Sequence, residues 1–391
     1  MTKPKILMLL TEYLPIFSGH AIYLDTLLPF FKQKNYLVKI LANDFNRLPA
    51  HEEINGILVD RIRFYNNNKH WELRQSFAIL KYLVKHRNNF DILHFHGHMD
   101  HYGLLALFCK LFKKRSIMQM VLVGTDDPLT IRHGYKLMWF RFKLFLQIDS
   151  FICISKALVN TCQQANIPEN KIFYIPQGVD TTRFYPVTNE EKQLLRIKLH
   201  LPADASIVVF IGAIIHRKGV DILIDAWKRI QPKHADALLL LVGPDEFNID
   251  DTNQKALETF VLNIRQQIAD NNLRVTMTGQ TDMVDQFLKA SDIFAFPSRK
   301  EGFGNVIIEA MACGLPAVIS NMDGVSAETV EQGADGFVVN DTIELQRSLE
   351  RLLLDESLRI RMGNNGRKKA VDVFKIETIA ERYLDLYRTI H

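Results

Sequence analysis

The chain has 391 residues, of which 47% are hydrophobic and 24% charged, and its formal net charge is +4 at pH 7. This length predicts two domains rather than one core, and the composition excludes a disordered or fibrous protein. No apolar run reaches the ~18–20 residues that cross a bilayer, and the four cysteines lack the CxxC spacing of a zinc site or the pattern of a disulfide frame.

The first half of the chain alternates short apolar runs with amphipathic stretches. We predict strands at 5–10, 38–44, 56–64, 91–96, 116–124, 149–155 and 171–178, and helices at about 20–34, 71–86 and 102–112. This rhythm is typical of a parallel sheet with helices on both faces. The first strand, KILMLL, is followed by Glu12 and by no small-residue cleavage site, so we interpret it as buried structure and not as a signal peptide.

The second half repeats the rhythm. We predict strands at 206–214, 237–244, 274–279, 292–298, 316–320 and 336–340, and helices at 219–230, 253–271, 282–290 and 304–313. The segment 176–186 is rich in turn formers and is the predicted linker. The predicted fold class is therefore α/β, with doubly wound Rossmann-like domains at 1–180 and 181–375 that face each other across a cleft, and a last helix at 376–391 that crosses back to the first domain.

The segment EGFGNVIIEAMACGLP, residues 301–316, has the pattern of a binding site. A predicted strand leads into a turn of two glycines, and a helix follows. This order directs free backbone N–H groups and the positive end of a helix dipole to one place, where a diphosphate fits. Glu309 lies one turn into the helix, where it can accept hydrogen bonds from a ribose diol, and Glu301 precedes the turn. Two glutamates near a helix start are also common in proteins without any such site.

Other polar residues follow predicted strands, where ligands of open α/β sheets bind. They include Gly19, His20, His96, His98 and Asp126. His94, His96 and His98 alternate along one strand end, but a metal site needs further ligands that the sequence does not offer, so we predict no metal and expect His96 to line the cleft or to pack.

Several of these segments together resemble the retaining glycosyltransferases of family 4, which have the GT-B fold. The signature E-x7-E of that family is similar to EGFGNVIIEAMACGLPAVIS, and its interdomain segment is similar to IPQGVDTTRFYP. The start of its donor domain resembles FIGAIIHRKGVDILIDAW, and two segments of its acceptor domain resemble DILHFHG and LPIFSGH. The resemblance covers nearly the whole chain, with its motifs in the family's order.

The resemblance implies a role for each matching residue. Lys218 would bind the diphosphate of a nucleotide sugar, Glu301 would contact the transferred sugar, and Glu309 would bind the ribose. The second domain would hold this donor and the first domain the acceptor. Gly19 would let the opposing loop approach the phosphates, since it has no Cβ. The remaining contacts would come from the backbone amides of Phe303, Gly304, Asn305 and Val306.

The sequence departs from the family pattern at two places. Many relatives have an arginine where this chain has Ala213, and Arg217 is then the candidate for the second cation at the phosphates. Many relatives also have a histidine near the sugar, at a place that is apolar here (Leu122 or Val123). Asp126 is the nearest polar candidate, with a turn or helix cap as the alternative interpretation.

The predicted activity is the retaining transfer of a hexose-type sugar from a nucleotide diphosphate sugar to a glycan, a lipid-linked saccharide or a small hydroxyl acceptor, without a cofactor. The alternatives are a nucleotide-sugar-binding pseudoenzyme and a dinucleotide-dependent oxidoreductase, although no G-x-G-x-x-G turn follows the early strands.

Charge is distributed unevenly along the chain, since the first 180 residues carry 23 Lys and Arg against 14 Asp and Glu and are therefore basic. The stretches FCKLFKKR (108–115) and KLMWFRFKLFLQ (136–147) mix bases with large apolar residues. They are either ordinary amphipathic helices or a surface that rests on an anionic membrane. We therefore expect a cytoplasmic protein, peripheral to the inner face of the membrane if the second interpretation holds. Nucleic acid is not an expected partner, because no binding motif accompanies the charge.

Overall fold

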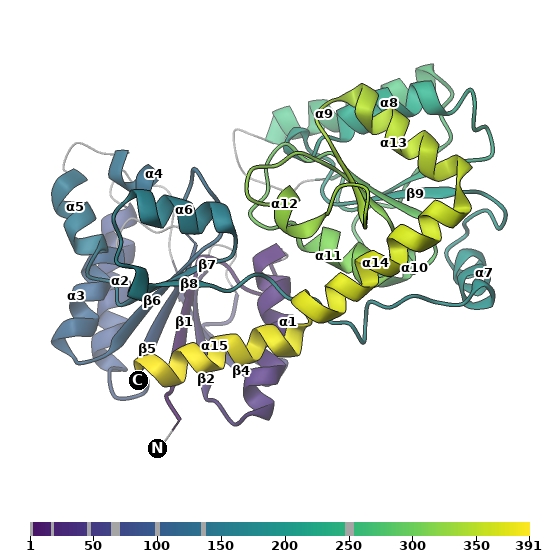
Figure 1. The fold of residues 1–391 in the computed structure, drawn as a ribbon. Helices are drawn as coiled ribbons and strands as arrows, with labels where there is room; N and C mark the ends of the chain where they lie inside the picture. The colour runs from purple at the N-terminus through teal and green to yellow at the C-terminus, as the bar shows by residue number, and fades with distance from the viewer. Residues whose placement is uncertain are drawn as a thin grey trace. The chain divides into compact units, whose positions relative to one another are not determined.

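The computed structural model describes residues 3–16, 19–44, 48–63, 71–97, 102–133, 138–246 and 254–391. The chain divides into two compact units (Figure 1). The first unit comprises Met1–Gly178 and Ile376–His391, and the second unit comprises Val179–Lys375. His98, one of the three alternating histidines, lies outside the described residues.

The first unit is built on an eight-stranded sheet with the order β3-β4-β2-β1-β5-β6-β7-β8. All neighbouring strands are parallel except β3 and β4, which form an antiparallel hairpin. The strands are β1 (Ile6–Leu10), β2 (Val38–Asp44), β3 (His51–Ile54), β4 (Ile57–Arg63), β5 (Ile92–His96), β6 (Arg115–Met120), β7 (Ser150–Cys153) and β8 (Ile172–Tyr174).

Edge strand β3 was not predicted, because its sequence HEEI has no apolar run and none of its residues is fully buried. The turn that joins β3 to β4 does carry a signal. Asn55 and Gly56 both have positive φ, 52° and 78°, as the two central residues of a tight hairpin turn require.

Strand β6 ends four residues earlier than predicted, at Met120. The reason is the buried carboxylate of Asp126, which accepts hydrogen bonds from the N–H groups of Val121 (2.7 Å) and Leu122 (2.8 Å). These N–H groups turn towards a side chain and cannot continue a strand ladder.

Helices cover this sheet, and one of them comes from the end of the chain. In Figure 1, α15 at the yellow end of the chain lies beside α1 at the purple end. The buried face of α15 recurs at helical spacing, and its Tyr383 and Tyr387 pack against Phe31 of α1. The helices are α1 (Gly19–Gln33), α2 (Trp71–Lys85), α3 (Tyr102–Leu111), α4 (Pro128–His133), α5 (Met138–Phe145), α6 (Lys156–Gln164) and α15 (Ile376–Ile390).

The second unit has a six-stranded parallel sheet with the order β11-β10-β9-β12-β13-β14. Its core includes the fully buried Trp227, Phe210, Phe294 and Phe296. The strands are β9 (Ile207–Ile211), β10 (Leu238–Val242), β11 (Val275–Met277), β12 (Ile293–Phe296), β13 (Ala317–Ser320) and β14 (Gly336–Val339). The helices are α7 (Asn189–Lys198), α8 (Val220–Ile230), α9 (Gln254–Asp270), α10 (Val284–Lys289), α11 (Asn305–Ala312), α12 (Ser326–Thr329), α13 (Thr342–Leu354) and α14 (Glu356–Phe374).

Each sheet has one place where the direction of strand addition reverses. In the first unit the chain adds strands on one side of β1 and then returns to add β5 on the other side; in the second unit the same reversal lies between β9 and β12. The carboxyl ends of the two strands at such a switch point are where open α/β sheets bind ligands. The two switch points are therefore the first places to look for a site.

Candidate functional site

At the switch point of the second unit, β12 leads into a glycine turn and then into α11. Gly304 has φ 80° and ψ 59°, a left-handed conformation that glycine adopts without strain. The conformation favours glycine, and a Cβ at this position would also lie 2.8 Å from Cδ1 of Ile307, so the end of that side chain would have to shift. The turn thus places the first turn of α11 directly beside the end of β12.

The N–H groups around this turn are free to bind a ligand. Within the part of the chain that the structure describes, the N–H groups of Phe303, Gly304, Asn305 and Val306 donate to no other protein group. They are the four amides that the family resemblance assigns to the donor. Four neighbouring free N–H groups at a helix start favour an anion or a set of hydroxyl groups.

Lys218 reaches the same place from the neighbouring strand. It ends the short 3-10 turn His216–Lys218 that follows β9, and its Nζ lies 2.7 Å from Oε1 of Glu301. The next residue, Gly219, has φ 72°, and a Cβ there would lie 1.9 Å from the carbonyl oxygen of Pro297. The close approach of the two loops is therefore possible only with glycine at position 219.

The carboxylate of Glu301 holds the cations in place. Its Oε1 also accepts from Oγ of Ser298 (2.6 Å) and from Nη1 of Arg217 (3.3 Å). The pKa of Lys218 is lowered, because the effect of burial outweighs that of the neighbouring Glu301 carboxylate, which raises it. Ser298 was not predicted as part of the site; the signal was its place at the end of a strand, three residues before Glu301.

Glu309 lies on α11 one turn beyond Asn305. Its carboxylate makes no hydrogen bond or ion pair with any described residue, and its side chain is half-buried. Burial raises the pKa of Glu309 to about 7, while the nearby Arg183 lowers it and Asp285 raises it further. An uncommitted carboxylate of this kind can accept hydrogen bonds from a diol when it is ionised. Arg183 and Asp285, which pair at 3.1 Å, were not predicted as its neighbours.

Two first-unit candidates, Gly19 and His96, lie at the other switch point, whereas Asp126 follows the next strand of the sheet. Gly19 begins α1 after β1, and a Cβ there would meet no heavy atom of the other described residues within 4 Å, its chain neighbours apart. His96 ends β5, is 2% exposed, and has its Nδ1 2.9 Å from Nε2 of His20. Asp126 follows β6, and its carboxylate holds the loop described above. A contact of Asp126 with substrate stays a prediction, whereas its role in the turn is visible.

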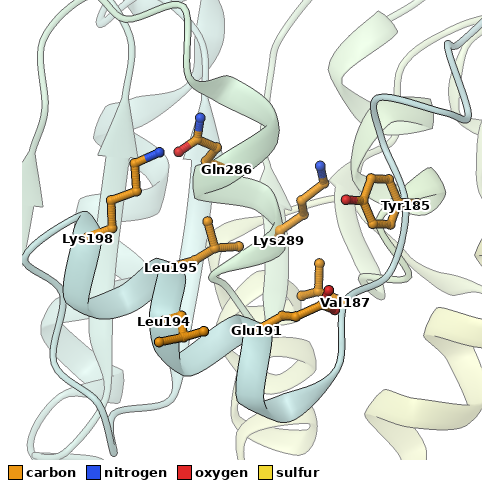
Figure 2. Close-up of a pocket in the computed structure, with 8 residues that line it drawn as sticks. All are labelled: Tyr185, Val187, Glu191, Leu194, Leu195, Lys198, Gln286 and Lys289. Carbon is orange, nitrogen blue, oxygen red and sulfur yellow. The ribbon is translucent and has the colours of Figure 1, made fainter.

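The second unit also has a pocket of about 280 Å³ between α7 and α10 (Figure 2). In Figure 2, Gln286 and Lys289 line it from α10, and Glu191, Leu194, Leu195 and Lys198 line it from α7. The ammonium of Lys289 lies 3.3 Å from Asp285 and 4.0 Å from the ring centre of Tyr185. None of the predicted site residues lines this pocket, so it is separate from the switch-point site.

No group of three or more His, Cys, Asp or Glu side chains in the described residues is arranged to hold a metal ion. Likewise, the helices of the described segments include none that is long and apolar enough to span a bilayer.

Comparison with known proteins covers most of the chain. The family described as Glycosyltransferase Family 4 matches residues 17–183, and the family described as Glycosyl transferases group 1 matches residues 191–369. The chain is 25% identical to an uncharacterized glycosyltransferase of Methanocaldococcus jannaschii, with 98% of each chain covered. It is 29% identical to a GDP-mannose-dependent monoacylated alpha-(1-6)-phosphatidylinositol monomannoside mannosyltransferase of Corynebacterium glutamicum, over 68% of this chain and 71% of that protein.

Among solved structures, the chain is similar to HepE of Anabaena in complex with UDP and glucose. The TM-score is 0.77 at 21% identity, and the match covers 99% of this chain and 100% of that one. A similarity of this kind, at this identity, concerns the fold.

Proposed function

The chain belongs to the group 1 and family 4 glycosyltransferases and has their GT-B fold, and from this premise we propose that it transfers a hexose-type sugar, with retention, from a nucleotide diphosphate sugar. The second unit binds the donor, and the first unit binds the acceptor, which is a glycan, a lipid-linked saccharide or a small molecule with a hydroxyl group. The names of relatives support this proposal, since one uses GDP-mannose on a phosphatidylinositol mannoside and another binds UDP and glucose.

One observation carries the proposal: Nζ of Lys218 lies 2.7 Å from Glu301 at the switch point, beside the four free N–H groups of residues 303–306. When the bond between the anomeric carbon and the phosphate oxygen breaks, negative charge grows on the diphosphate. Fixed cations and N–H groups aimed at that charge lower the barrier. An ammonium has three N–H donors, so Lys218 can keep its bond to Glu301 and still donate to a phosphate oxygen.

The other residues have distinct tasks in this proposal. Arg217 adds a second positive charge, Glu301 contacts the transferred sugar, and Glu309 accepts from the ribose hydroxyls. The acceptor hydroxyl attacks the anomeric carbon from the leaving-group face and gives its proton to a phosphate oxygen, so the configuration is retained. The diphosphate charge is carried by side chains and N–H groups, and no metal ion takes part.

Lys218→Ala tests the proposal. The wild type is first screened by thermal shift and by product release against UDP-glucose, UDP-galactose and GDP-mannose. We expect the variant to lose about 10²–10³-fold in kcat with the donor that the wild type consumes. Lys369→Ala is the matched control, because Lys369 is also half-buried and also pairs with a buried carboxylate, that of Asp335 at 3.2 Å.

Three results contradict the proposal. They are a wild type that consumes none of the donors, a Lys218→Ala variant with wild-type turnover, and an equal loss in the Lys369→Ala control. A wild type that is stabilised by a nucleotide sugar but never consumes it indicates the binding protein without transfer activity that the sequence left open.

We also propose that the surface formed by α3 and α5 rests on an anionic membrane at its cytoplasmic face. Leu104, Leu107 and Leu111 of α3 are 44%, 41% and 76% exposed, and Phe140 of α5 is 53% exposed. Exposed bases occur in the same stretch of the chain, namely Lys110 on α3 and Lys113 and Arg115 just after it. Apolar side chains together with bases fit the boundary between acyl chains and anionic headgroups.

Liposome pelleting tests the membrane proposal. The wild type is expected to pellet with phosphatidylserine vesicles at low salt and to be released at high salt. Leu107→Glu with Leu111→Glu should abolish pelleting. The control pair Leu194→Glu with Ile197→Glu places the same charges on exposed apolar positions of α7, 66% and 67% exposed, and should leave pelleting unchanged. Failure of the wild type to pellet would refute the proposal.

A further inference from the structure

Two histidines meet at the switch point of the first unit. His20 lies at the start of α1, after β1, and His96 ends β5, the strand that pairs with β1. Nε2 of His20 lies 2.9 Å from Nδ1 of His96, and the ring centroids are 4.9 Å apart. This pair therefore stands in the first unit where Lys218 and Glu301 stand in the second.

Buried side chains of β5, β6 and α15 surround the ring of His96 or support its neighbours. The ring of His94 lies 4.0 Å from it between centroids, and Nδ1 of His94 is 2.8 Å from the hydroxyl of Tyr387 on α15. Gln119, which is opposite His96 in the β5–β6 register, accepts a hydrogen bond from Tyr383 of the same helix. The packing of α15 against the sheet thus fixes the position of His96 and, through it, that of His20.

The hydrogen-bond partners decide which nitrogen of each ring carries the proton. Nε2 of His96 is buried and has no hydrogen-bond partner among the described residues. A buried N–H without an acceptor is rarer than a buried acceptor without a donor. His96 therefore carries its proton on Nδ1 and donates to Nε2 of His20, which leaves the proton of His20 on Nδ1.

The second nitrogen of His20 is uncommitted. The side chain is half-buried, and Nδ1 makes no hydrogen bond to any residue that the structure describes. Burial lowers the pKa of His20 to about 4 and holds the pKa of His96 well below 6.5, so both rings are neutral near pH 7. His20 is thus a neutral hydrogen-bond donor, held in one orientation, at the end of the sheet where α/β proteins bind ligands.

We propose that His20 is a substrate-contacting residue whose Nδ1–H donates a hydrogen bond to an oxygen of the bound substrate. The oxygen belongs either to a phosphate of the donor or to a hydroxyl of the acceptor. This inference rests on the proposed glycosyltransferase reaction and adds to it a residue to which the family resemblance assigned no role.

Three substitutions at this position test the inference. His20→Asn keeps an N–H near the place of Nδ1, His20→Gln keeps only the contact towards His96, and His20→Ala keeps neither. We expect kcat/KM for transfer to fall roughly tenfold in the Ala and Gln variants, as for the loss of one neutral hydrogen bond, and to stay within about threefold of wild type in the Asn variant. His86→Gln, a histidine at the end of α2 and away from both switch points, should transfer like the wild type.

Two further measurements identify the oxygen. If it is a phosphate oxygen, His20→Ala also binds the free nucleoside diphosphate, UDP or GDP according to the donor consumed, roughly tenfold more weakly in calorimetry. If it is an acceptor hydroxyl, nucleotide affinity and donor hydrolysis without acceptor are unchanged, and KM for the acceptor rises.

The inference is overturned if Lys218→Ala abolishes turnover while His20→Ala and His20→Gln match the wild type in both transfer and nucleotide affinity; the proposed function then stands. A wild type that consumes no nucleotide sugar overturns the proposed function and this inference with it. If His20→Ala does not fold, as judged by its melting temperature, the contrast between the Asn and Gln variants decides, and equal activities of those two overturn the inference.

Discussion

The switch points of the two units lie at equivalent places in their sheets but carry different chemical groups. The switch point of the second unit holds a cluster of charges, with Lys218 and Arg217 on the carboxylate of Glu301. The switch point of the first unit holds the neutral rings of His20 and His96, backed by the tyrosines of α15. Since charge must be stabilised only where it develops, our proposal assigns the leaving diphosphate to the charged switch point of the second unit and a neutral hydrogen-bond donor to that of the first.

The largest expected effect concerns the charged cluster of the second unit. Glu301→Ala removes the carboxylate that holds both cations and, in our proposal, a contact with the transferred sugar. We expect transfer to fall about 10²–10³-fold. Steady-state transfer assays measure this, and Glu350→Ala, which removes a surface partner of Lys233, is the control. Wild-type transfer by Glu301→Ala would remove the charged cluster from the mechanism.

Gly304→Ala tests the turn that presents the free N–H groups. The variant combines an unfavourable φ of +80° with a contact of 2.8 Å to Ile307, and we expect it to lose about 2–3 kcal/mol of unfolding free energy. Gly333→Ala is a matched control, since φ is +78° there and, in the described part of the chain, no residue beyond its neighbours lies within 4 Å of the Cβ. It should lose only about 1 kcal/mol. Urea denaturation measures both, and equal losses would show that packing does not constrain the turn.

Glu309→Gln tests the uncommitted carboxylate through pH. The pKa of Glu309 is raised from 4.5 to about 7 in the folded state, so the folded state binds the proton more tightly than the unfolded state. Stability is therefore lost as pH rises from about 4.5 through 7. We expect the wild type to lose on the order of 1–2 kcal/mol relative to Glu309→Gln between pH 5 and pH 8. Parallel stability curves in urea denaturation would show that burial does not perturb this carboxylate.

Arg217→Ala asks whether the second cation takes part in the chemistry. Its side chain is 45% exposed, and its Nη1 lies 3.3 Å from Glu301, against 2.7 Å for Nζ of Lys218. Because water screens an exposed charge, we expect a loss of about tenfold in kcat, well below that of Lys218→Ala. Turnover near the wild-type rate would leave Lys218 as the one cation that acts.

The smallest expected effect concerns the neutral histidines of the first unit and the tyrosine that contacts them. Tyr387→Phe removes the hydroxyl that bonds His94 and preserves the ring packing of α15. We expect a loss of about 1 kcal/mol in unfolding free energy and a decrease of only a few-fold in transfer. Urea denaturation and transfer assays measure the two effects. Wild-type stability and transfer in Tyr387→Phe would show that this hydroxyl does not support the histidines.

The sequence alone determined the architecture and the family. Strands β1, β9 and β12 are short, wholly apolar runs, and the alternation of such runs with amphipathic helices sufficed for the doubly wound fold. The family rested on ordered motifs, and the E-x7-E segment led to the Glu301–Glu309 site because strand, turn and helix are local features that neighbouring residues encode.

Only the tertiary structure decided which side chains meet. Lys218 and Glu301 are 83 positions apart, and His94 and Tyr387 are 293 apart, so strand order and helix packing had to be known before these pairs were visible. The early end of β6 likewise depends on where the Asp126 carboxylate turns, and edge strand β3 depends on pairing with β4 rather than on its own apolar pattern. Hydrophobic periodicity records which face of an element is buried; it holds no information about the partner that covers that face.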